Sequence, residues 1–148
     1  MMSPRLAVAL LVLATGSIPL PADLKPALAE PNLERRSKLA LDNAAALLDA
    51  ARADYTKGDN ARVAAEIAEL RESVDLAYKS LQDTGKNPRK SSHWFKYAEI
   101  HTRDLLRKLD TFENDMSFDD RPPVQKAKEE VQKVHDDLLL GLMEGKPK

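Results

Sequence analysis

Residues 116–142, MSFDDRPPVQKAKEEVQKVHDDLLLGL, decide the fold of this 148-residue chain. After the prolines, apolar residues recur at alternating spacings of three and four, the pattern of a helix that packs along one face. Proline fixes φ at roughly −65° and has no N–H, so Pro122-Pro123 fits only the first turn of a helix. The stretch therefore predicts a turn followed by a helix over 122–143.

The Asp-Asp pair before the prolines is explained by this turn. Asp119 and Asp120 are expected at the helix N-terminus, where negative charge is favourable by about 0.3 to 1 kcal/mol. A residue before proline is pushed out of the α region, so we expect Arg121 to be non-helical. Phe118 is expected to fold back onto the first turn of the helix as a hydrophobic staple.

Three upstream segments carry the same periodicity and predict helices over 32–57, 60–83 and 92–116. Gly58-Asp59 and the TGKNP stretch at 84–88 separate these segments, and aspartate or serine stands where each following helix would need an N-cap. Short loops make consecutive helices antiparallel. The predicted fold is all-α, an up-down-up-down four-helix bundle built from two long helical hairpins.

The first 29 residues have the order of a secretory signal peptide. Arg5 precedes the apolar run LAVALLVLA, and Ala27-Leu28-Ala29 supplies a small-x-small cleavage site. The apolar run is shorter than the about 20 residues that a spanning helix needs, although an uncleaved membrane anchor is the alternative. We expect cleavage after Ala29, which leaves residues 30–148 as one exported domain, periplasmic or secreted, with no stable membrane span.

The composition excludes several classes of chemistry. The chain has no cysteine, so disulfides, thiolate metal sites and cysteine nucleophiles are absent. Its 23 Lys and Arg residues against 24 Asp and Glu residues give a net charge of −1, which provides no general attraction to nucleic acid. Charges of both signs are interspersed, as expected for solvated helix faces.

The cluster SSHWFKY, residues 91–97, holds the candidate interaction residues. On the predicted apolar stripe Trp94 is central and is expected in the core, while Phe95 and Tyr97 lie at the two borders. With Lys90 beside them, these rings could contact a partner protein, a glycan or an anionic lipid surface. The alternative is that they seal the end of the bundle under the preceding loop.

Two histidines are the candidate metal residues. His101 lies in the third stripe and His135 close to the fourth, at nearly the same height on antiparallel neighbours. If they are adjacent, they could hold Zn²⁺ or Cu²⁺ together with Glu99, Asp136 or Asp137. The alternative is that each histidine packs in the core and is satisfied by hydrogen bonds.

The sequence predicts no catalytic residue and no cofactor. It contains no GxSxG nucleophile motif, no glycine-rich phosphate loop and no HExxH zinc motif. Adjacent carboxylates on a helix point apart, whereas acid/base catalysis needs groups that converge on a cleft. We therefore expect a protein that is not an enzyme.

The stretch ARADYTKGDNARVAAEIAEL, residues 51–70, resembles the central part of a tetratricopeptide repeat. The matching positions are Ala51, Tyr55, Gly58-Asp59, Val63, Ile67 and Leu70. No second copy follows about 34 residues later, so the resemblance implies a TPR-like helical hairpin and not a repeat array. The layout as a whole is also similar to small exported all-helical proteins of bacteria, a likeness that implies export but no activity.

These observations favour a structural or protein-interaction module that contacts an unknown cell-envelope protein, as a monomer or a weak homo-oligomer. The proposed contacts are the Trp94 end or the exposed sides of the first two helices. A carrier of a metal or small ligand in the His101 and His135 region is the alternative function.

Overall fold

The computed structural model describes residues 23–146, which form helices and no strand. The helices are α1 (Lys25–Ala29), α2 (Leu33–Thr56), α3 (Asn60–Asp83), α4 (Ser92–Asp115) and α5 (Pro122–Glu144), with a short 3₁₀ helix η1 (Phe118–Asp120). All four predicted helices are confirmed to within one residue at each end, and α1 was not predicted. The apolar run behind the signal-peptide prediction lies outside the described residues.

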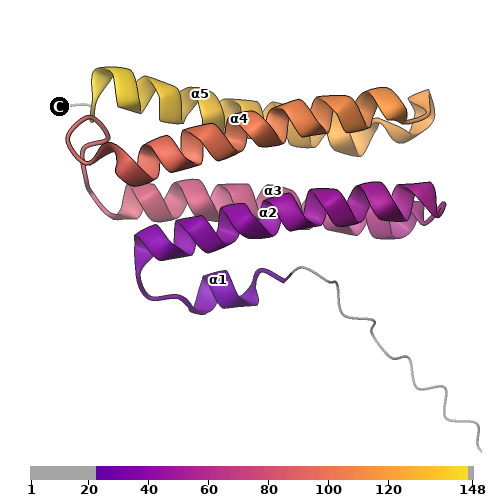
Figure 1. Ribbon diagram of the computed structural model, residues 1–148, viewed down its shortest axis with the longest axis horizontal. Helices are drawn as coiled ribbons and strands as arrows, with labels where there is room; N and C mark the ends of the chain where they lie inside the picture. Colours follow the sequence, from indigo (N-terminus) through magenta and orange to yellow (C-terminus); the bar gives the residue numbers. More distant parts are fainter. Residues whose placement is uncertain (1–22, 147–148) are drawn as a thin grey trace, which may run out of the picture.

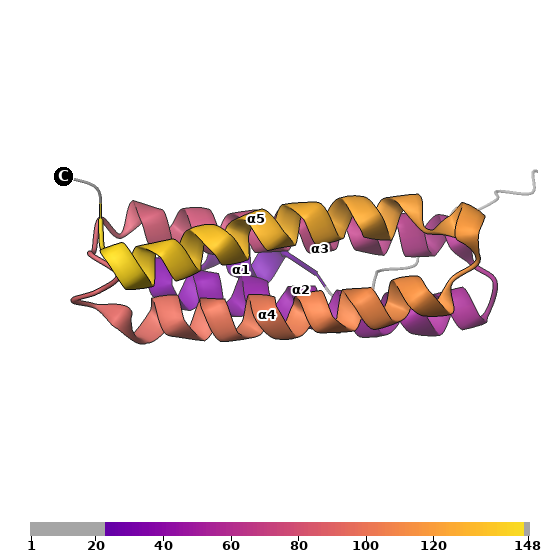
Figure 2. The ribbon, with the colours of Figure 1, turned by 90° about the horizontal axis from the view of Figure 1, so that it is seen from above.

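The long helices form two layers, as Figure 1 shows, with α2 and α3 in one and α4 and α5 in the other. Seen from above in Figure 2, α5 lies over α3 and α4 lies over α2. The predicted all-α, up-down-up-down four-helix bundle is therefore confirmed. Within residues 23–146, no helix is both long enough and apolar enough to span a membrane.

The turns between the helices contain the N-cap and glycine residues that the sequence analysis identified. The side chains of Asn32 and Asp59 cap α2 and α3 by accepting hydrogen bonds from the Arg35 and Arg62 backbone N–H groups, at 2.9 and 3.1 Å. Gly58, between α2 and α3, has φ of +79°, a conformation that costs glycine little because it has no Cβ. Ser91 occupies the N-cap position of α4 but makes no capping hydrogen bond.

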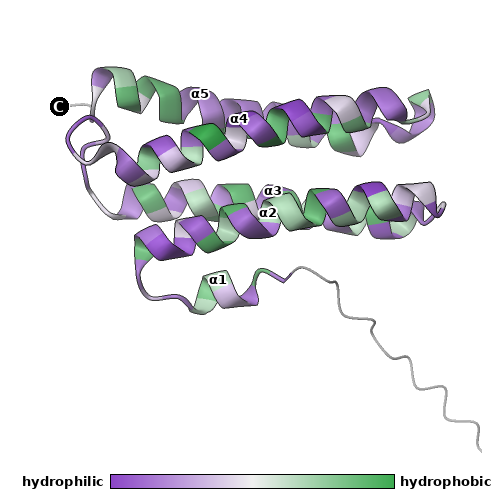
Figure 3. Cartoon of the chain, in the orientation of Figure 1, coloured by the Kyte–Doolittle hydropathy of each residue, from purple (hydrophilic) through white to green (hydrophobic). Residues whose placement is uncertain are grey.

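One core runs the length of the bundle between the layers, and Figure 3 shows apolar stretches alternating with polar ones along each helix. The largest fully buried apolar side chains are Phe112, Leu47, Leu48, Ile67, Leu70, Leu81, Leu109 and Leu138. The contact between α2 and α3 is the most extensive between any two helices. Buried alanines, such as Ala40, Ala44 and Ala77, let these two backbones approach closely.

Several polar side chains are buried along α2 and α3. The Asn43 side-chain amide donates to Ser73 Oγ at 3.0 Å, and the Ser73 hydroxyl donates to the Glu69 carbonyl at 2.8 Å. Glu66 is fully buried, and neither of its carboxylate oxygens has a hydrogen-bond partner in the described protein. A buried polar group without a hydrogen bond is costly, and Glu66 is the described residue in which both carboxylate oxygens lack one.

Two sets of contacts tie the layers together. Arg71 of α3 makes a two-pronged ion pair with Glu130 of α5, with N–O distances of 2.6 and 2.7 Å. At the turn between α4 and α5, the Tyr55 hydroxyl donates to Asp120 Oδ2 at 3.0 Å and accepts from the Ser117 N–H at 2.9 Å. Two-pronged arginine–carboxylate pairs are among the stronger polar contacts in proteins, so they fix the relative position of the layers.

The turn at 116–121 departs from the prediction in two ways. Helix α5 begins at Pro122, with proline in its first turn, as expected, but Arg121 has φ −70° and ψ −30° and is not extended. Phe118 is not a staple, because 80% of its surface is exposed. The Asp120 carboxylate accepts a hydrogen bond from the Tyr55 hydroxyl, and the Arg121 side chain donates to the Met116 carbonyl at 3.1 Å. These contacts fix a 3₁₀ turn that directs Phe118 away from α5.

Candidate functional site

The predicted interaction residues gather at one end of the bundle, which we call the 84–91 end. It comprises the loop 84–91, the first turns of α4 and the last turns of α5. The structure places Phe95 in the core, while Trp94 and Tyr97 are half-buried and Lys90 is exposed. The predicted positions of Trp94 and Phe95 are therefore reversed.

The reversal has a physical reason. The buried face of α4 consists of Phe95, Ala98, Thr102, Leu105, Leu109 and Phe112. The predicted stripe used Trp94 and His101 instead of Phe95 and Thr102, which is a shift of one residue in the first turns. Thr102 can be buried because its hydroxyl donates to the Ala98 carbonyl at 2.8 Å and is close to the Glu99 carbonyl at 3.0 Å. A threonine that bonds its own helix needs no other partner.

The displaced rings form a row along the outside of α4. Trp94 packs edge-on against Tyr97, with ring centroids 5.7 Å apart, and Tyr97 lies against His101 at 3.9 Å. The Tyr97 hydroxyl donates to Asp42 of α2 at 3.1 Å, and burial together with this carboxylate raises the pKa of Tyr97. Tyr97 therefore joins α4 to α2 and is held in place by that contact.

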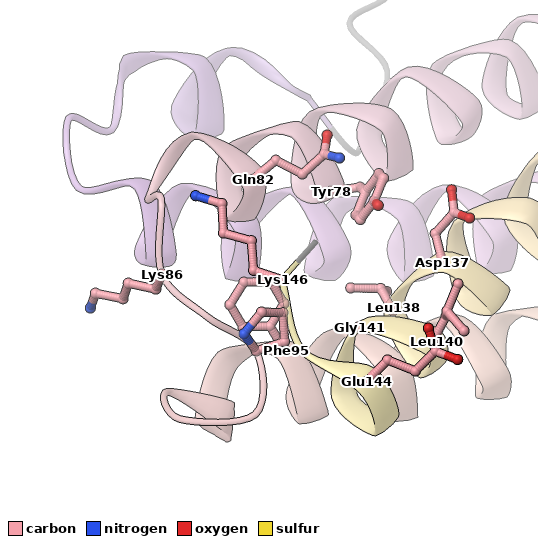
Figure 4. Close-up of a pocket in the computed structure, with 12 residues that line it drawn as sticks. Tyr78, Gln82, Lys86, Phe95, Asp137, Leu138, Leu140, Gly141, Glu144 and Lys146 are labelled. Carbon is pink, nitrogen blue, oxygen red and sulfur yellow. The ribbon is translucent and has the colours of Figure 1, made fainter. Parts of the chain in front are cut away.

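On the other side of α4 the 84–91 end is hollow. A cavity of about 690 Å³ opens between α3, α5 and the loop 84–91 (Figure 4). The buried side chains of Phe95 and Leu138 contribute to its lining, together with Tyr78 of α3 and Pro88 of the loop. This volume lies within the roughly 300 to 1,000 Å³ of sites that bind small molecules or side chains.

Two glycines, Gly141 in α5 and Gly145 directly after its end, shape the cavity where the loop meets the helix. A Cβ on Gly141 would stand 3.2 Å from Pro88 Cγ, and a Cβ on Gly145 would stand 3.1 Å from Asn87 Oδ1. Both distances are shorter than ordinary van der Waals contact. The missing side chains therefore let the loop 84–91 lie directly on the end of α5.

The rim of the cavity carries four charged side chains, those of Lys86, Asp137, Glu144 and Lys146. Lys86 is held by Glu34 at 2.5 Å, and Lys146 donates to the Gly85 carbonyl at 3.2 Å. Asp137 and Glu144 also line the cavity, and neither forms an ion pair with another described residue. Burial, and then the charge of Asp137, raise the pKa of Tyr78. The cavity therefore offers two unpaired carboxylates above an apolar floor.

Exposed apolar side chains continue from the cavity onto the surface of α5. Leu140 lines the cavity and is 52% exposed, and Leu139 and Met143 on the same two turns are also exposed. Figure 3 shows these last turns of α5 coloured as hydrophobic. A group of exposed large apolar residues beside an open cavity is typical of a surface that contacts another molecule.

The candidate metal residues have separate partners. His135 Nε2 lies 3.0 Å from Glu99 Oε1, and His135 Nδ1 lies 3.5 Å from Asp136 Oδ1. His101 packs instead on Tyr97, on the side of α4 that contacts α2. Within residues 23–146 no group of three or more His, Cys, Asp or Glu residues is arranged to hold a metal ion.

The sequence prediction missed the cavity, although two signals pointed to it. Gly141 interrupts an otherwise strongly helical stretch, and proline stands at position 88 in the facing loop. A glycine within a helix often marks a close approach by another segment. The sequence did not indicate which segment approaches Gly141, because the loop 84–91 and the end of α5 are about 50 residues apart in the chain.

The search for relatives adds no family to this description. No protein family model, curated protein or solved structure matches the chain significantly.

Proposed function

We propose that this chain is an exported, non-enzymatic helical module that binds another protein of the cell envelope through the 84–91 end. The observation that carries the proposal is the open cavity of about 690 Å³, with Phe95 and Leu138 in its lining and the exposed Leu140 at its edge. An apolar side chain of a partner fits a hollow of this kind. Protein interfaces commonly have an apolar centre surrounded by a polar rim.

The rim supports a partner with positive charge near its apolar anchor. Asp137 and Glu144 have no ion-pair partner among the described residues, whereas Lys86 and Lys146 are each already bonded within the chain. A lysine or arginine of the partner would therefore find an unpaired carboxylate at the edge of the cavity. Such rim charges contribute chiefly to the rate and specificity of association.

Export and the absence of enzymatic activity are supported by the sequence. A basic residue, Arg5, followed by the apolar run at 6–14, supports export. The lack of nucleophile, phosphate-loop and zinc-protease motifs supports a role in binding. The TPR-like stretch at 51–70 supports the same role, because that repeat is a protein-binding unit.

Photo-crosslinking tests the proposal. A photoreactive amino acid replaces Leu140 in cells that express the full chain, and a matched control carries it at Phe118, which is exposed at the opposite end of the bundle. We expect a crosslinked band of higher mass from position 140 and not from 118. Equal labelling at both positions, or none at 140, would contradict the proposal.

The mass of the crosslinked band identifies the occupant. A band at twice the mass of the chain would show a second copy of this protein in place of a different partner. A photoreactive residue at the neighbouring exposed position 143 should give the same crosslinked band. Adding Leu140→Asp to that protein should remove the band. Because Leu140 is exposed, this change should leave the melting temperature unchanged.

A further inference from the structure

The segment before α2 is part of the folded domain. Leu24 and Ala27 belong to the core cluster, with 8% and 2% of their surfaces exposed. Figure 1 shows α1 under the layer of α2 and α3, on the side away from α4 and α5. Residues 24–29 therefore cover the outer face of that layer with two side chains, while Leu28, which follows Ala27, is 55% exposed.

Polar contacts hold both ends of the segment. At its start the Leu24 N–H donates to the Glu69 carboxylate of α3 at 3.1 Å. At its end the Glu30 carbonyl accepts from Arg36 Nε of α2 at 2.8 Å. The other Glu69 oxygen is buried and has no hydrogen-bond partner in the described protein. Without Leu24, the Glu69 carboxylate would lose the one hydrogen bond that it makes with the described residues.

A signal peptidase that cuts after Ala29 would remove the contacts of Leu24 and Ala27, while the hydrogen bond between the Glu30 carbonyl and Arg36 would remain. Leu24 and Ala27 would leave the core cluster, and the face of α2 and α3 that they cover would become exposed. The expected cleavage site is also far from the apolar run, which ends at Ala14. Small residues that suit the enzyme stand closer to that run, at Gly16 and Ala22.

We propose that export processing cuts this chain before Leu24 and not after Ala29. Residues 24–29 then stay on the mature protein and occupy the outer face of α2 and α3 within the same molecule. This inference rests on the proposed export of the protein. In this proposal the Ala27-Leu28-Ala29 triplet is the end of helix α1, and Ala27 packs in the core. The triplet resembles a cleavage site only because its two alanines are small.

Intact-mass analysis of the exported protein tests the proposal. The full chain is expressed in a bacterium, the periplasmic and membrane fractions are separated, and the mass of the chain in each is measured. We expect a mature N-terminus at Leu24 or earlier. A mature chain that begins at Glu30 would overturn the inference and leave export intact. A chain that is uncut and remains in the cytoplasm would overturn both proposals.

Ala29→Gln gives a second, independent readout. Ala29 is exposed, so the longer side chain is tolerated by the fold. A large residue directly before the scissile bond blocks cleavage after position 29 but leaves an earlier site unaffected. We expect normal processing of this variant. Accumulation of the precursor would show that the enzyme uses Ala29 and would overturn the inference.

The contribution of the segment to the mature fold is measured with two leucine variants. Leu24→Ala should lower the melting temperature of the exported protein by about 5 °C, because a buried leucine is lost. Leu28→Ala is the matched control in the same segment and should leave the melting temperature unchanged. Equal melting temperatures for both variants and the wild type would show that the segment does not contribute to the fold.

Discussion

Glu66 should make the stability of this protein depend on pH. It is fully buried in α3, and both of its carboxylate oxygens lack a hydrogen-bond partner in the described protein. Two charged groups face it, namely Arg62 Nε at 3.4 Å from the same helix and Asp54 of α2, which itself lies 3.1 Å from Arg62 Nε. Burial chiefly, and then the neighbouring Asp54, raise the pKa of Glu66 from 4.5 to about 7.

The direction of the effect follows from the raised pKa. Between about pH 4.5 and pH 7 the folded protein keeps a proton on Glu66 that the unfolded chain has lost. The contribution to stability is therefore fully present below pH 4.5 and is lost as the pH rises through 7. A tenfold difference in proton affinity corresponds to about 1.4 kcal/mol, so the free energy of unfolding should fall by about 2 to 3 kcal/mol between pH 5 and pH 8 from this residue.

The assay is urea denaturation of the wild type and Glu66→Gln at pH 5, 6, 7 and 8. Glutamine has the same shape and no charge, so the variant should gain about 2 to 3 kcal/mol relative to the wild type between pH 5 and pH 8. Glu72→Gln, an exposed change in the same helix, is the control and should keep a constant difference from the wild type. A constant difference for Glu66→Gln, or an equal trend for the control, would refute the reasoning.

Three further changes test other parts of the structure. Gly58→Ala places a Cβ at φ +79° and should lower the free energy of unfolding by about 1 kcal/mol, whereas a neutral result in urea denaturation would show that the turn can rearrange. Tyr55→Phe removes the hydroxyl between Asp120 and the Ser117 N–H and should cost about 1 to 2 kcal/mol by the same assay; an unchanged stability would mean that water replaces it. Added Zn²⁺ should leave the melting temperature unchanged, because no three or more His, Cys, Asp or Glu side chains among the described residues are arranged to hold a metal ion. A rise that His135→Ala abolishes would disprove this.

The sequence predicts the helices well because their boundaries are set locally. The periodicity of apolar residues marks each helix, and the prolines at 122–123 and the Gly58-Asp59 pair mark the breaks between them. Asn32 and Asp59 cap α2 and α3 through backbone N–H groups three residues away. Helix periodicity, helix breaks and N-caps depend only on neighbouring residues, so they can be predicted from the sequence before the fold is known.

The candidate site depends on contacts between residues that are distant in the sequence, and such contacts could not be predicted from local patterns. Whether Trp94 or Phe95 enters the core depends on the rotation of α4, which packing against α2 and α5 decides. The burial of Thr102 in place of His101 follows from the same rotation. The cavity requires the loop 84–91 to meet the end of α5, and the short helix α1 is stabilised by the face that it covers.

The hydrogen bond between the buried side chains of Asn43 and Ser73 favours one alignment of α2 and α3. A displacement of α3 by one turn, about 5.4 Å, would misalign the buried leucine, isoleucine and valine side chains of the two helices and would also separate Asn43 from Ser73. That displacement would strand the Asn43 amide in the core, at a cost of about 1 to 3 kcal/mol. The polar pair thus adds to the apolar packing that fixes the register, and with it the height at which α3 presents Tyr78 and Gln82 to the cavity.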